Sequence, residues 1–302
     1  GAGRVGRMIG DALAVRQGSS AQPRRGELRR IEPGFGEIGR QAALEVRRAG
    51  VRVASHQASS AVLRPSSRLY FRAMDVPALA ARLAAVRDRL AARQSVGGWS
   101  HPVRIVAVTK THGPEVVRAA HAAGMTDVGE NRVQEALAKQ DACADVPVAW
   151  HLVGGVQRNK ARHAVGRFAL IHSVDRIELA RELDRRVEGD APQPVLVQVN
   201  CSAEPQKGGV EPDRLTVLLD ELRECHALAV RGLMTMAAFD AAERDLRQAF
   251  GLLRSLRESA EAAGHHLPEL SMGMSDDFEV AVEEGATMVR LGTVLFGDRP
   301  TD

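Results

Sequence analysis

Short apolar runs rich in β-branched residues alternate with longer segments of helical periodicity from about residue 76 onward. The apolar runs predict eight strands, at residues 104–110, 126–130, 149–154, 169–174, 194–200, 228–236, 269–275 and 288–296. Helical sequence lies between each pair, and one further helix, from Val76 to about Arg93, precedes the first strand. The apolar face of that helix is made of Leu79, Leu83, Val86 and Leu90. This alternation predicts an α/β fold, a single (β/α)8 TIM barrel, with an open doubly wound sheet as the alternative.

Residues 1–73 show no sustained periodicity and hold Ser- and Arg-rich stretches, which predicts low order with at most a short helix across Gly39–Ala49. The opening Gly-Ala-Gly-Arg-Val-Gly matches the spacing of a dinucleotide-binding fingerprint. That motif needs a strand before it and a second strand after it, and neither is predicted here. We therefore expect a leader at 1–73 and one barrel domain at 74–302, with Met74 as a candidate natural start.

The positive charge of the chain is concentrated in the leader. The formal net charge is +3, but residues 1–73 carry 14 arginines against 5 acidic residues, which leaves 27 basic and 33 acidic residues in 74–302. A barrel with an acidic excess lacks the basic surface that phosphate backbones require, so the pattern argues against a nucleic-acid-binding domain.

Composition and cysteine usage indicate a cytoplasmic protein. No apolar run approaches the roughly 20 residues that span a bilayer, and the amino end lacks the order of a secretory signal. The three cysteines, Cys143, Cys201 and Cys225, are far apart, which suggests neither a disulfide framework nor a zinc site. Adjacent His265 and His266 diverge on a helix and have no further ligand nearby in sequence, so we expect no metal site.

Lys110 is the most unusual residue of the first predicted strand. The run from Ile105 to Val108 is apolar throughout, which indicates a strand buried on both faces. It ends in a lysine and passes directly into a turn, Thr111-His-Gly-Pro114. Desolvation at such an edge favours the neutral amine, the form that makes a Schiff base with an aldehyde cofactor. The alternative is a lysine that merely extends to solvent.

Polar residues recur where the other predicted strands end. They are Glu130, Asn131, His151, Gly154, His172, Ser173, Asn200, Met234, Thr235, Ser275, Arg290, Gly292 and Thr293. Each alone fits a hydrogen-bonded group in a turn, but barrels assemble their chemistry at the carboxyl ends of the strands. Together they predict a functional site on that rim, where we expect the two histidines to form hydrogen bonds.

The segment Ser271–Glu279 predicts a strand, a turn and a helix start, with Ser275 as N-cap and the side chains of Asp276 and Asp277 turned outward. A helix start beside Gly292 and Thr293 offers N–H groups and hydroxyls to a phosphate monoester.

Arg290 is the second odd charge on an apolar strand. If it faces the site, its permanent cation can lie against a pyridine nitrogen. It cannot accept a proton, so it would leave that nitrogen unprotonated and weaken the ring as an electron sink.

These motifs resemble the pyridoxal phosphate homeostasis protein family, in matching order from about residue 78 to 299. The matching segments are Ala107-Val-Thr-Lys110, Gly129-Glu-Asn131, Trp150-His151, Gln157-x-Asn159-Lys160, His172-Ser-Val-Asp175, Gln198-Val-Asn200, Lys207-x-Gly209, Arg231-Gly-Leu-Met-Thr235, Ser271-Met-Gly-Met-Ser275-x-Asp-Phe-Glu279 and Val289-Arg-x-Gly-Thr293. The resemblance implies a pyridoxal 5′-phosphate (PLP) site made of Lys110, Asn131, Met234, Ser275, Arg290, Gly292 and Thr293. In it the lysine carries the Schiff base, the serine, glycine and threonine hold the phosphate, and the arginine faces the ring nitrogen. The asparagine and methionine line the pocket.

The family's fold is a lone barrel related to the N-terminal domain of alanine racemase. Its members bind PLP without an established catalytic reaction, and the resemblance implies a role in intracellular vitamin B6 homeostasis. We therefore expect a non-catalytic protein that buffers PLP or delivers it transiently to PLP-dependent apo-enzymes, as a monomer or weak homodimer, with indirect effects on amino-acid pools. The sequence departs from the family pattern in two places, at Arg132, where tyrosine is usual, and at Gly155-Val156 before Gln157. These departures leave open which partner or ligand contacts form at the rim.

The main alternative is a PLP-dependent amino-acid racemase or decarboxylase on the same barrel. A two-base racemase of the alanine racemase type needs a tyrosine opposite its lysine, and the only tyrosine, Tyr70, lies in the leader. His151 or His172 are the candidate substitutes. A second alternative is a scaffold that has lost its ligand, which the retained polar groups on buried strands argue against.

Overall fold

The structure, a computed structural model, describes residues 74–202, 204 and 208–297. The leader, with its expected low order and short helix at 39–49, lies outside the described residues. So do Lys207 and the segment from residue 298 onward. The boundary between leader and barrel domain therefore stays a prediction.

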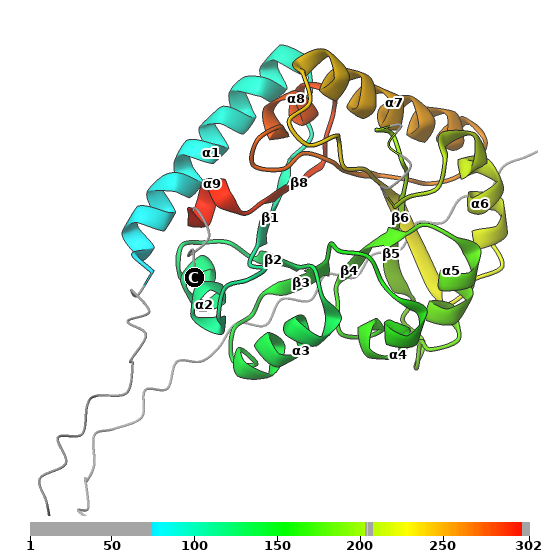
Figure 1. Cartoon of the computed structure of the whole chain (residues 1–302), viewed down its shortest axis with the longest axis horizontal. Coiled ribbons are helices and arrows are strands. Elements are labelled where there is room, and N and C mark those ends of the chain that lie inside the picture. The colour runs from blue at the N-terminus through cyan, green and yellow to red at the C-terminus, as the bar shows by residue number, and fades with distance from the viewer. Residues whose placement is uncertain (1–73, 203, 205–207, 298–302) are drawn as a thin grey trace, which may run out of the picture. The chain divides into compact units, whose positions relative to one another are not determined.

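Strands and helices alternate along the described chain (Figure 1). The strands are β1 (Arg104–Val108), β2 (Asp127–Glu130), β3 (Ala149–Leu152), β4 (Leu170–Val174), β5 (Gln193–Gln198), β6 (Leu228–Met234), β7 (Glu269–Ser271) and β8 (Met288–Leu291). The α-helices are α1 (Val76–Gly97), α2 (Pro114–Ala122), α3 (Val133–Ala142), α4 (Ala161–Ala164), α5 (Ile177–Asp184), α6 (Leu215–Leu222), α7 (Glu243–Ala262), α8 (Phe278–Glu283) and α9 (Thr293–Phe296). Two short 3₁₀ turns, η2 (Arg158–Lys160) and η3 (Pro212–Arg214), lead into α4 and α6.

The eight strands form a closed, all-parallel barrel in sequence order. The first and last strands close it, with Arg104 opposite Met288 and Ala107 opposite Leu291. The (β/α)8 prediction is confirmed, and the open sheet is excluded. Closure places the carboxyl ends of all strands at one rim, which we call the upper rim. The amino ends surround the opposite opening, which we call the lower mouth.

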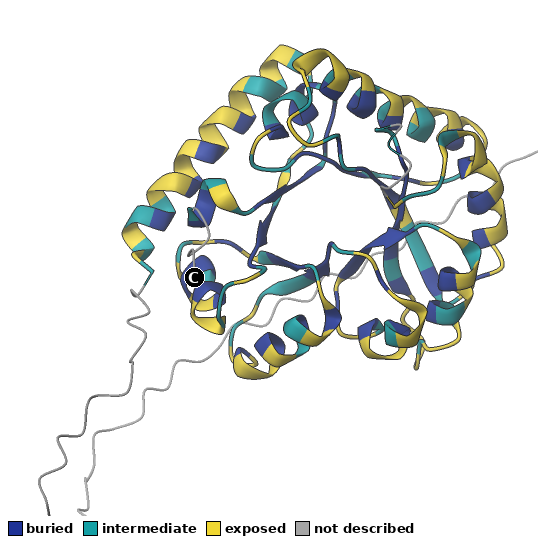
Figure 2. Ribbon diagram, in the orientation of Figure 1, coloured by how far each residue is buried: buried dark blue, intermediate teal, exposed yellow. Residues whose placement is uncertain are grey.

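Side chains that alternate along each strand fill two different spaces. The outward-facing set packs under the helices in a large apolar core. The inward-facing set is smaller and contains Val106, Val108, Val153, Leu170, Leu196, Met234 and Met288. Figure 2 shows the strands almost wholly buried, while the helices expose their outer faces. The rest of the barrel interior is polar, unlike the layered apolar filling usual in this fold.

Helix α1 follows the predicted pattern and runs one turn further. Asp75 accepts a hydrogen bond from the Ala78 N–H at 3.1 Å at its start, and Gly98, with φ 73°, ends it in the left-handed conformation. The predicted stripe of four apolar side chains is buried. No helix in the described part of the chain is long and apolar enough to cross a bilayer.

The strand predictions fail mainly at their carboxyl ends. The segment 269–275 forms a strand only to Ser271, and 293–296, predicted as part of the last strand, is helix α9. Both segments carry apolar side chains, Met272 in the first and Leu295 with Phe296 in the second, that are buried in the large core under the helices, so their composition resembles that of a buried strand.

Gly232 in β6 has a φ of 156°, and a Cβ there would lie 1.9 Å from the carbonyl oxygen of Glu269. Only glycine lets β6 approach β7 so closely. The register between β5 and β6 shifts between Val195 and Leu196, immediately beside this point.

Candidate functional site

The seven residues expected to form the site all lie at the upper rim or just inside it. Lys110 follows β1, Asn131 follows β2 and Ser275 follows β7. Met234 ends β6 and is fully buried in the inward-facing cluster. Arg290 lies within β8, and Gly292 with Thr293 begins α9. Barrel closure therefore places five strand ends, from Lys110 after β1 to Thr293 after β8, on one rim.

Lys110 is half-buried and sits in a constrained turn. The residue before it, Thr109, is fully buried and its N–H donates to the Gly129 carbonyl at 2.9 Å. The residue after it, Thr111, has a φ of 69°, an unfavourable conformation for a β-branched residue. Strain of this kind persists only where the surroundings enforce it, and it fixes the direction in which the lysine leaves the strand.

A buried ion pair lies directly behind this turn. The Lys139 amine of α3 is 2.6 Å from Glu130 Oε1 at the end of β2, and it also donates to the Thr109 carbonyl at 2.7 Å. The Thr109 hydroxyl donates to the same carboxylate oxygen at 2.5 Å. Lys139 is 8% exposed and Glu130 is 0% exposed. The pair therefore anchors the peptide that carries Lys110.

This ion pair is not among the residues predicted for the site, although the sequence carries a signal for it. Lys139 falls on the buried stripe of α3, where Val133 and Ala136 precede it at helical spacing. Glu130 ends an otherwise apolar strand. Two opposite charges at buried positions nine residues apart on consecutive elements would have predicted an ion pair.

His112 ties the lysine turn to the last helix. Its ring packs against Phe296 of α9 with a centroid distance of 5.7 Å. Burial, followed by the charge of Lys139, lowers the pKa of His112 below its usual range. The ring is therefore neutral at neutral pH and acts as a packing contact between β1 and α9.

The neighbouring part of the rim, after β7 and β8, is arranged around Ser275. Its Oγ accepts hydrogen bonds from the N–H groups of Gly292 at 3.2 Å and Val294 at 3.3 Å. These N–H groups begin α9, so the hydroxyl occupies the position from which an anion could also accept them. A Cβ on Gly292 would lie 3.4 Å from the Val108 carbonyl oxygen, so the absence of a side chain there keeps the first turn of α9 close to β1.

The expected capping arrangement of this segment is wrong for Ser275 and Asp277, whereas Asp276 is exposed as expected. Asp277, not Ser275, stands at the N-cap of α8. Its side chain is not turned outward, because it is 8% exposed and accepts from the Met274 N–H at 2.5 Å. Burial raises the pKa of the Asp277 carboxyl. Ser275 consequently does not cap α8, and its hydroxyl accepts the N–H groups at the start of α9 instead.

Arg290 projects into the barrel and is 4% exposed. Its guanidinium donates to the Ser271 hydroxyl oxygen at 2.8 Å and to the Thr235 carbonyl at 2.8 Å. Both acceptors are neutral. Burial lowers the pKa of Arg290 to about 10, opposed only by the charge of Asp277, so the cation persists at neutral pH. A buried cation held by neutral groups alone is a costly arrangement that indicates a functional role.

His151 and His172 do form hydrogen bonds, but not at the rim. Both are buried in the barrel interior. His172 contacts Ser271 at 3.0 Å and His151 at 3.0 Å, and His151 reaches Asp127 at the lower mouth at 3.0 Å. Their inward position on β3 and β4 follows from strand alternation, which composition alone does not reveal.

The upper rim thus offers an amine from β1, hydroxyl and N–H donors at α9, and a buried cation between them. These groups suit an elongated ligand with an anionic group at one end and an electrophilic carbon at another. A group of three His, Cys, Asp or Glu side chains that could hold a metal ion does not occur among the residues described.

Comparisons with known proteins agree on one family. Residues 75–300 match the family model described as alanine racemase, N-terminal domain. The pyridoxal phosphate homeostasis protein of Aquifex aeolicus (strain VF5) is 42% identical over 221 residues, which is 72% of this chain and 97% of that protein. The protein of the same name from Pseudomonas aeruginosa is 43% identical over 223 residues, 73% of this chain and 96% of that one.

Solved structures give the same result. PipY of Synechococcus elongatus PCC7942 with PLP bound superposes with a TM-score of 0.65 at 38% identity, covering 72% of this chain and 100% of PipY. An alanine racemase of Clostridium difficile 630 superposes with a TM-score of 0.61 at 14% identity, covering 76% and 59% of the two chains. The second similarity is one of fold alone.

Proposed function

Since the chain belongs to the pyridoxal phosphate homeostasis protein family and contains an alanine racemase N-terminal domain, we propose that it binds PLP covalently through Lys110 and serves as a reversible store of it. The observation that carries the proposal is the convergence of three groups on one rim. They are the strand-end amine of Lys110, the donor cluster of Ser275 with Gly292, and the buried cation of Arg290.

The donor set fits the chemistry of this cofactor. Bound PLP supplies an aldehyde that reacts reversibly with a primary amine, a phosphate monoester and a pyridine nitrogen. Ser275, the N–H groups at the start of α9 and Thr293 would hold the phosphate, and Arg290 would face the ring nitrogen. Asn131 and Met234 would complete the walls of the pocket.

The residues behind the rim prepare this arrangement. The Lys139–Glu130 pair holds the peptide before Lys110, which keeps the amine directed into the site. Arg290 stays protonated at neutral pH. It would therefore donate a hydrogen bond to the ring nitrogen without transferring its proton to that nitrogen. The site holds the cofactor without making it a strong electron sink.

Storage is favoured over racemisation by the position of the candidate second bases. Both ring nitrogens of His151 and of His172 are engaged in hydrogen bonds inside the barrel, while Tyr70 lies outside the described residues. We propose that transient contact with PLP-dependent apo-enzymes completes delivery. The three cysteines are free thiols in the structure, which supports the proposed cytoplasmic location.

The test is an absorbance titration of the purified protein with PLP, followed by borohydride reduction and peptide mapping. We expect a visible band in the parent that Lys110→Ala abolishes, and reduction should attach the cofactor to Lys110. Lys160→Ala, which removes a lysine of η2, should behave like the parent. Cofactor attached to another lysine, or a band unaffected by Lys110→Ala, would overturn the proposal.

A second measurement addresses catalysis. Incubation of the PLP-loaded protein with single enantiomers of amino acids should leave their optical rotation unchanged. Steady racemisation that disappears in Lys110→Ala would favour the racemase alternative instead.

A further inference from the structure

The segment Arg231-Gly-Leu-Met-Thr235 is only partly used by the proposed cofactor site. Met234 belongs to that site, whereas Arg231 of the same strand borders a cavity in the lower mouth. The cavity has a volume of about 460 Å³, within the range of roughly 300–1,000 Å³ that is typical of small-molecule sites. A ligand can therefore fit here, and the chemistry of the walls determines which one.

A bulge in β6 directs Arg231 toward this cavity. The pairing with β5 passes from Val230 directly to Gly232, so Arg231 is an extra residue without a partner on that strand. Val230 and Leu233 both pack in the core under the helices, although residues three apart in a regular strand lie on opposite faces. Gly232 accommodates the irregularity with a φ of 156°. The bulge thus keeps the packing of β6 while Arg231 faces the cavity.

Arg231 has a carboxylate beside it but does not pair with it. Glu269 of β7 is the register partner of Gly232 and borders the same cavity. Arg231 nevertheless forms neither a hydrogen bond nor an ion pair with any residue that the structure describes. Glu269 Oε2 accepts from the Thr287 hydroxyl at 2.8 Å, but Oε1 has only the Arg104 guanidinium nearby, at 3.7 Å. A guanidinium and a carboxylate oxygen on neighbouring strands therefore keep their capacity for hydrogen bonds.

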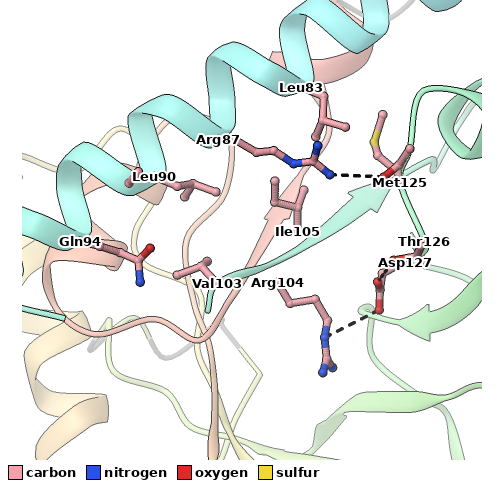
Figure 3. A pocket seen from close by; sticks show the side chains of 12 residues that line it. Leu83, Arg87, Leu90, Gln94, Val103, Arg104, Ile105, Met125, Thr126 and Asp127 are labelled. Carbon is pink, nitrogen blue, oxygen red and sulfur yellow. Dashed lines mark hydrogen bonds and ion pairs between the residues drawn. The ribbon is translucent and has the colours of Figure 1, made fainter. Parts of the chain in front are cut away.

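Arg104 is a second, loosely held cation at the mouth. Its guanidinium lies 3.9 Å from Asp127 Oδ1, beyond hydrogen-bond distance, as the dashed line in Figure 3 marks. Asp127 is already engaged, because its two oxygens have the Thr126 hydroxyl at 2.6 Å and His151 at 3.0 Å as partners. Donor capacity at the mouth thus belongs to both arginines, which favours a ligand with a carboxylate.

The other wall of the cavity is apolar. It consists of side chains at β3, at the start of β4 and in β5, namely Ala149, Ala169, Leu170 and Pro194. The strand order of the closed barrel places β3 and β4 away from β7, which carries Glu269. A matching ligand therefore has charged groups at one end and an apolar body at the other.

A structural role alone explains this arrangement less well. The lower face of a barrel usually serves stability, and charges that stabilise a fold pair with each other or with the backbone. Here an arginine and a glutamate on adjacent strands stay unpaired with each other, and the strand takes up an extra residue to present the arginine. Bulges that re-aim a side chain in this way are frequent beside functional sites.

We infer that the lower mouth binds a free α-amino acid with an apolar side chain. Its carboxylate accepts hydrogen bonds from Arg231, whose planar guanidinium matches the two carboxylate oxygens. Its ammonium group donates to Glu269 Oε1, and its side chain packs against the apolar wall. An α-amino acid carries both charges on one carbon, as this pair of neighbouring groups requires. The inference goes beyond the proposed function and does not depend on PLP.

The test is isothermal titration calorimetry of the full chain, without PLP, with L-leucine as the probe. We expect saturable binding of one leucine per chain. Isocaproate lacks the ammonium group of leucine and isoamylamine lacks its carboxylate, so each should bind weaker by about tenfold or more. The absence of leucine binding would overturn the inference. So would isocaproate binding as tight as that of leucine, because the site would then recognise a carboxylate alone.

Variants locate the binding at the lower mouth. Arg231→Gln and Glu269→Gln should each lower leucine affinity about 10- to 100-fold, because each removes a charge-assisted hydrogen bond. Since Arg231 makes no bond to the described residues, Arg231→Gln should unfold at the same urea concentration as the parent. Arg244→Gln, at an arginine of α7 whose side chain is 91% exposed, is the matched control and should bind leucine like the parent. Unchanged leucine affinity in Arg231→Gln would contradict the inference.

A further variant separates this site from the cofactor site. An amino acid could also bind at the upper rim, so leucine is titrated into Lys110→Ala, which should bind it like the parent. Loss of leucine binding in that variant would place the ligand at the upper rim and overturn the inference. If the protein binds leucine at the lower mouth but no PLP, the proposed function fails and the inference stands. If PLP binds through Lys110 and leucine does not bind, the reverse holds.

Discussion

Two buried cations lie beside the proposed site, and they are compensated in different ways. Lys139, behind the turn of Lys110, is paired with the carboxylate of Glu130 at 2.6 Å. Arg290, on the neighbouring strand β8, is held by a hydroxyl and a carbonyl, and the charge of Asp277 favours its protonated form. The first cation has a carboxylate in direct contact, whereas the hydrogen bonds that the second makes with the described residues go to neutral groups.

The difference separates structural from functional use of buried charge. A paired lysine with a second bond to the backbone fixes the geometry of a strand end. An arginine that lacks a carboxylate at hydrogen-bonding distance keeps donor capacity for a ligand, at a cost in stability that the folded protein tolerates. Four changes test this contrast between the two buried cations.

The largest effect is expected from Lys139→Met. It leaves the fully buried Glu130 carboxylate without its cation, and breaking a buried pair in this way costs about 3–5 kcal/mol. Urea unfolding of the protein without PLP measures the loss. The double variant Lys139→Met/Glu130→Leu should recover most of it, because it removes the unpaired charge as well. A loss below about 1 kcal/mol in the single variant would show that the pair does not anchor the strand end.

Arg290→Met should reduce PLP affinity more than it reduces stability. The free energy of unfolding without PLP should change by less than about 2 kcal/mol, since the removed desolvation cost offsets the hydrogen bonds lost to Ser271 and Thr235. PLP affinity should fall about 10- to 100-fold. Titration of PLP absorbance measures the affinity, and urea unfolding of the same preparation measures the stability. A variant that is strongly destabilised but retains full affinity would reverse the roles assigned to the two cations.

Acid should destabilise the arginine side through His172. Its pKa is depressed in the folded protein, chiefly by burial, so below about pH 6.5 the unfolded chain takes up a proton that His172 does not. Stability is therefore fully present above that pH and falls as the pH drops, by up to about 1.4 kcal/mol per pH unit. Unfolding between pH 7 and pH 5 measures the slope, and His172→Gln should flatten it. A slope unchanged in that variant would place the acid sensitivity elsewhere.

The smallest effect is expected from Thr111→Gly. Glycine adopts the positive φ of this position without strain, so the substitution should change the free energy of unfolding by about 1 kcal/mol or less. It also removes the hydroxyl that donates to the Lys110 carbonyl and frees the turn. PLP should consequently dissociate faster from Lys110, as measured by transfer to an excess of a PLP-binding apo-enzyme. An unchanged dissociation rate would show that the strained turn does not restrain the lysine.

Much of the fold could be predicted from sequence because strand and helix periodicities are local. All eight strands occur where apolar runs predict them, and the helix from Val76 carries its four buried residues at the expected spacing. The errors arise where the chain crosses the upper rim. There Thr293–Phe296 is apolar because Leu295 and Phe296 are buried in the large core under the helices, which composition cannot distinguish from a strand.

The site could be predicted only as a set of strand ends. Lys110, Ser275 and Arg290 attract attention because charge or hydroxyl groups follow apolar runs. The partners of these residues do not attract attention in the sequence. The hydrogen bonds from Arg290 to Ser271 and between Ser271 and His172 depend on strand register and on which face of each strand points inward. A single residue of register shift would send these side chains outward. Whether the seven residues bind cofactor stays a prediction.

The pairing of β1 with β8 also has a consequence for how the protein is made. Arg104 and Met288 are neighbours in the sheet but are separated by almost the whole barrel sequence. During synthesis, β1 must wait for β8 to leave the ribosome before it gains its second neighbour, and such long-range closure is slow. Lys110 is made early in translation, whereas Arg290 and the start of α9 follow only after almost the whole barrel sequence. The proposed site is therefore complete only after β8 and α9 have been made.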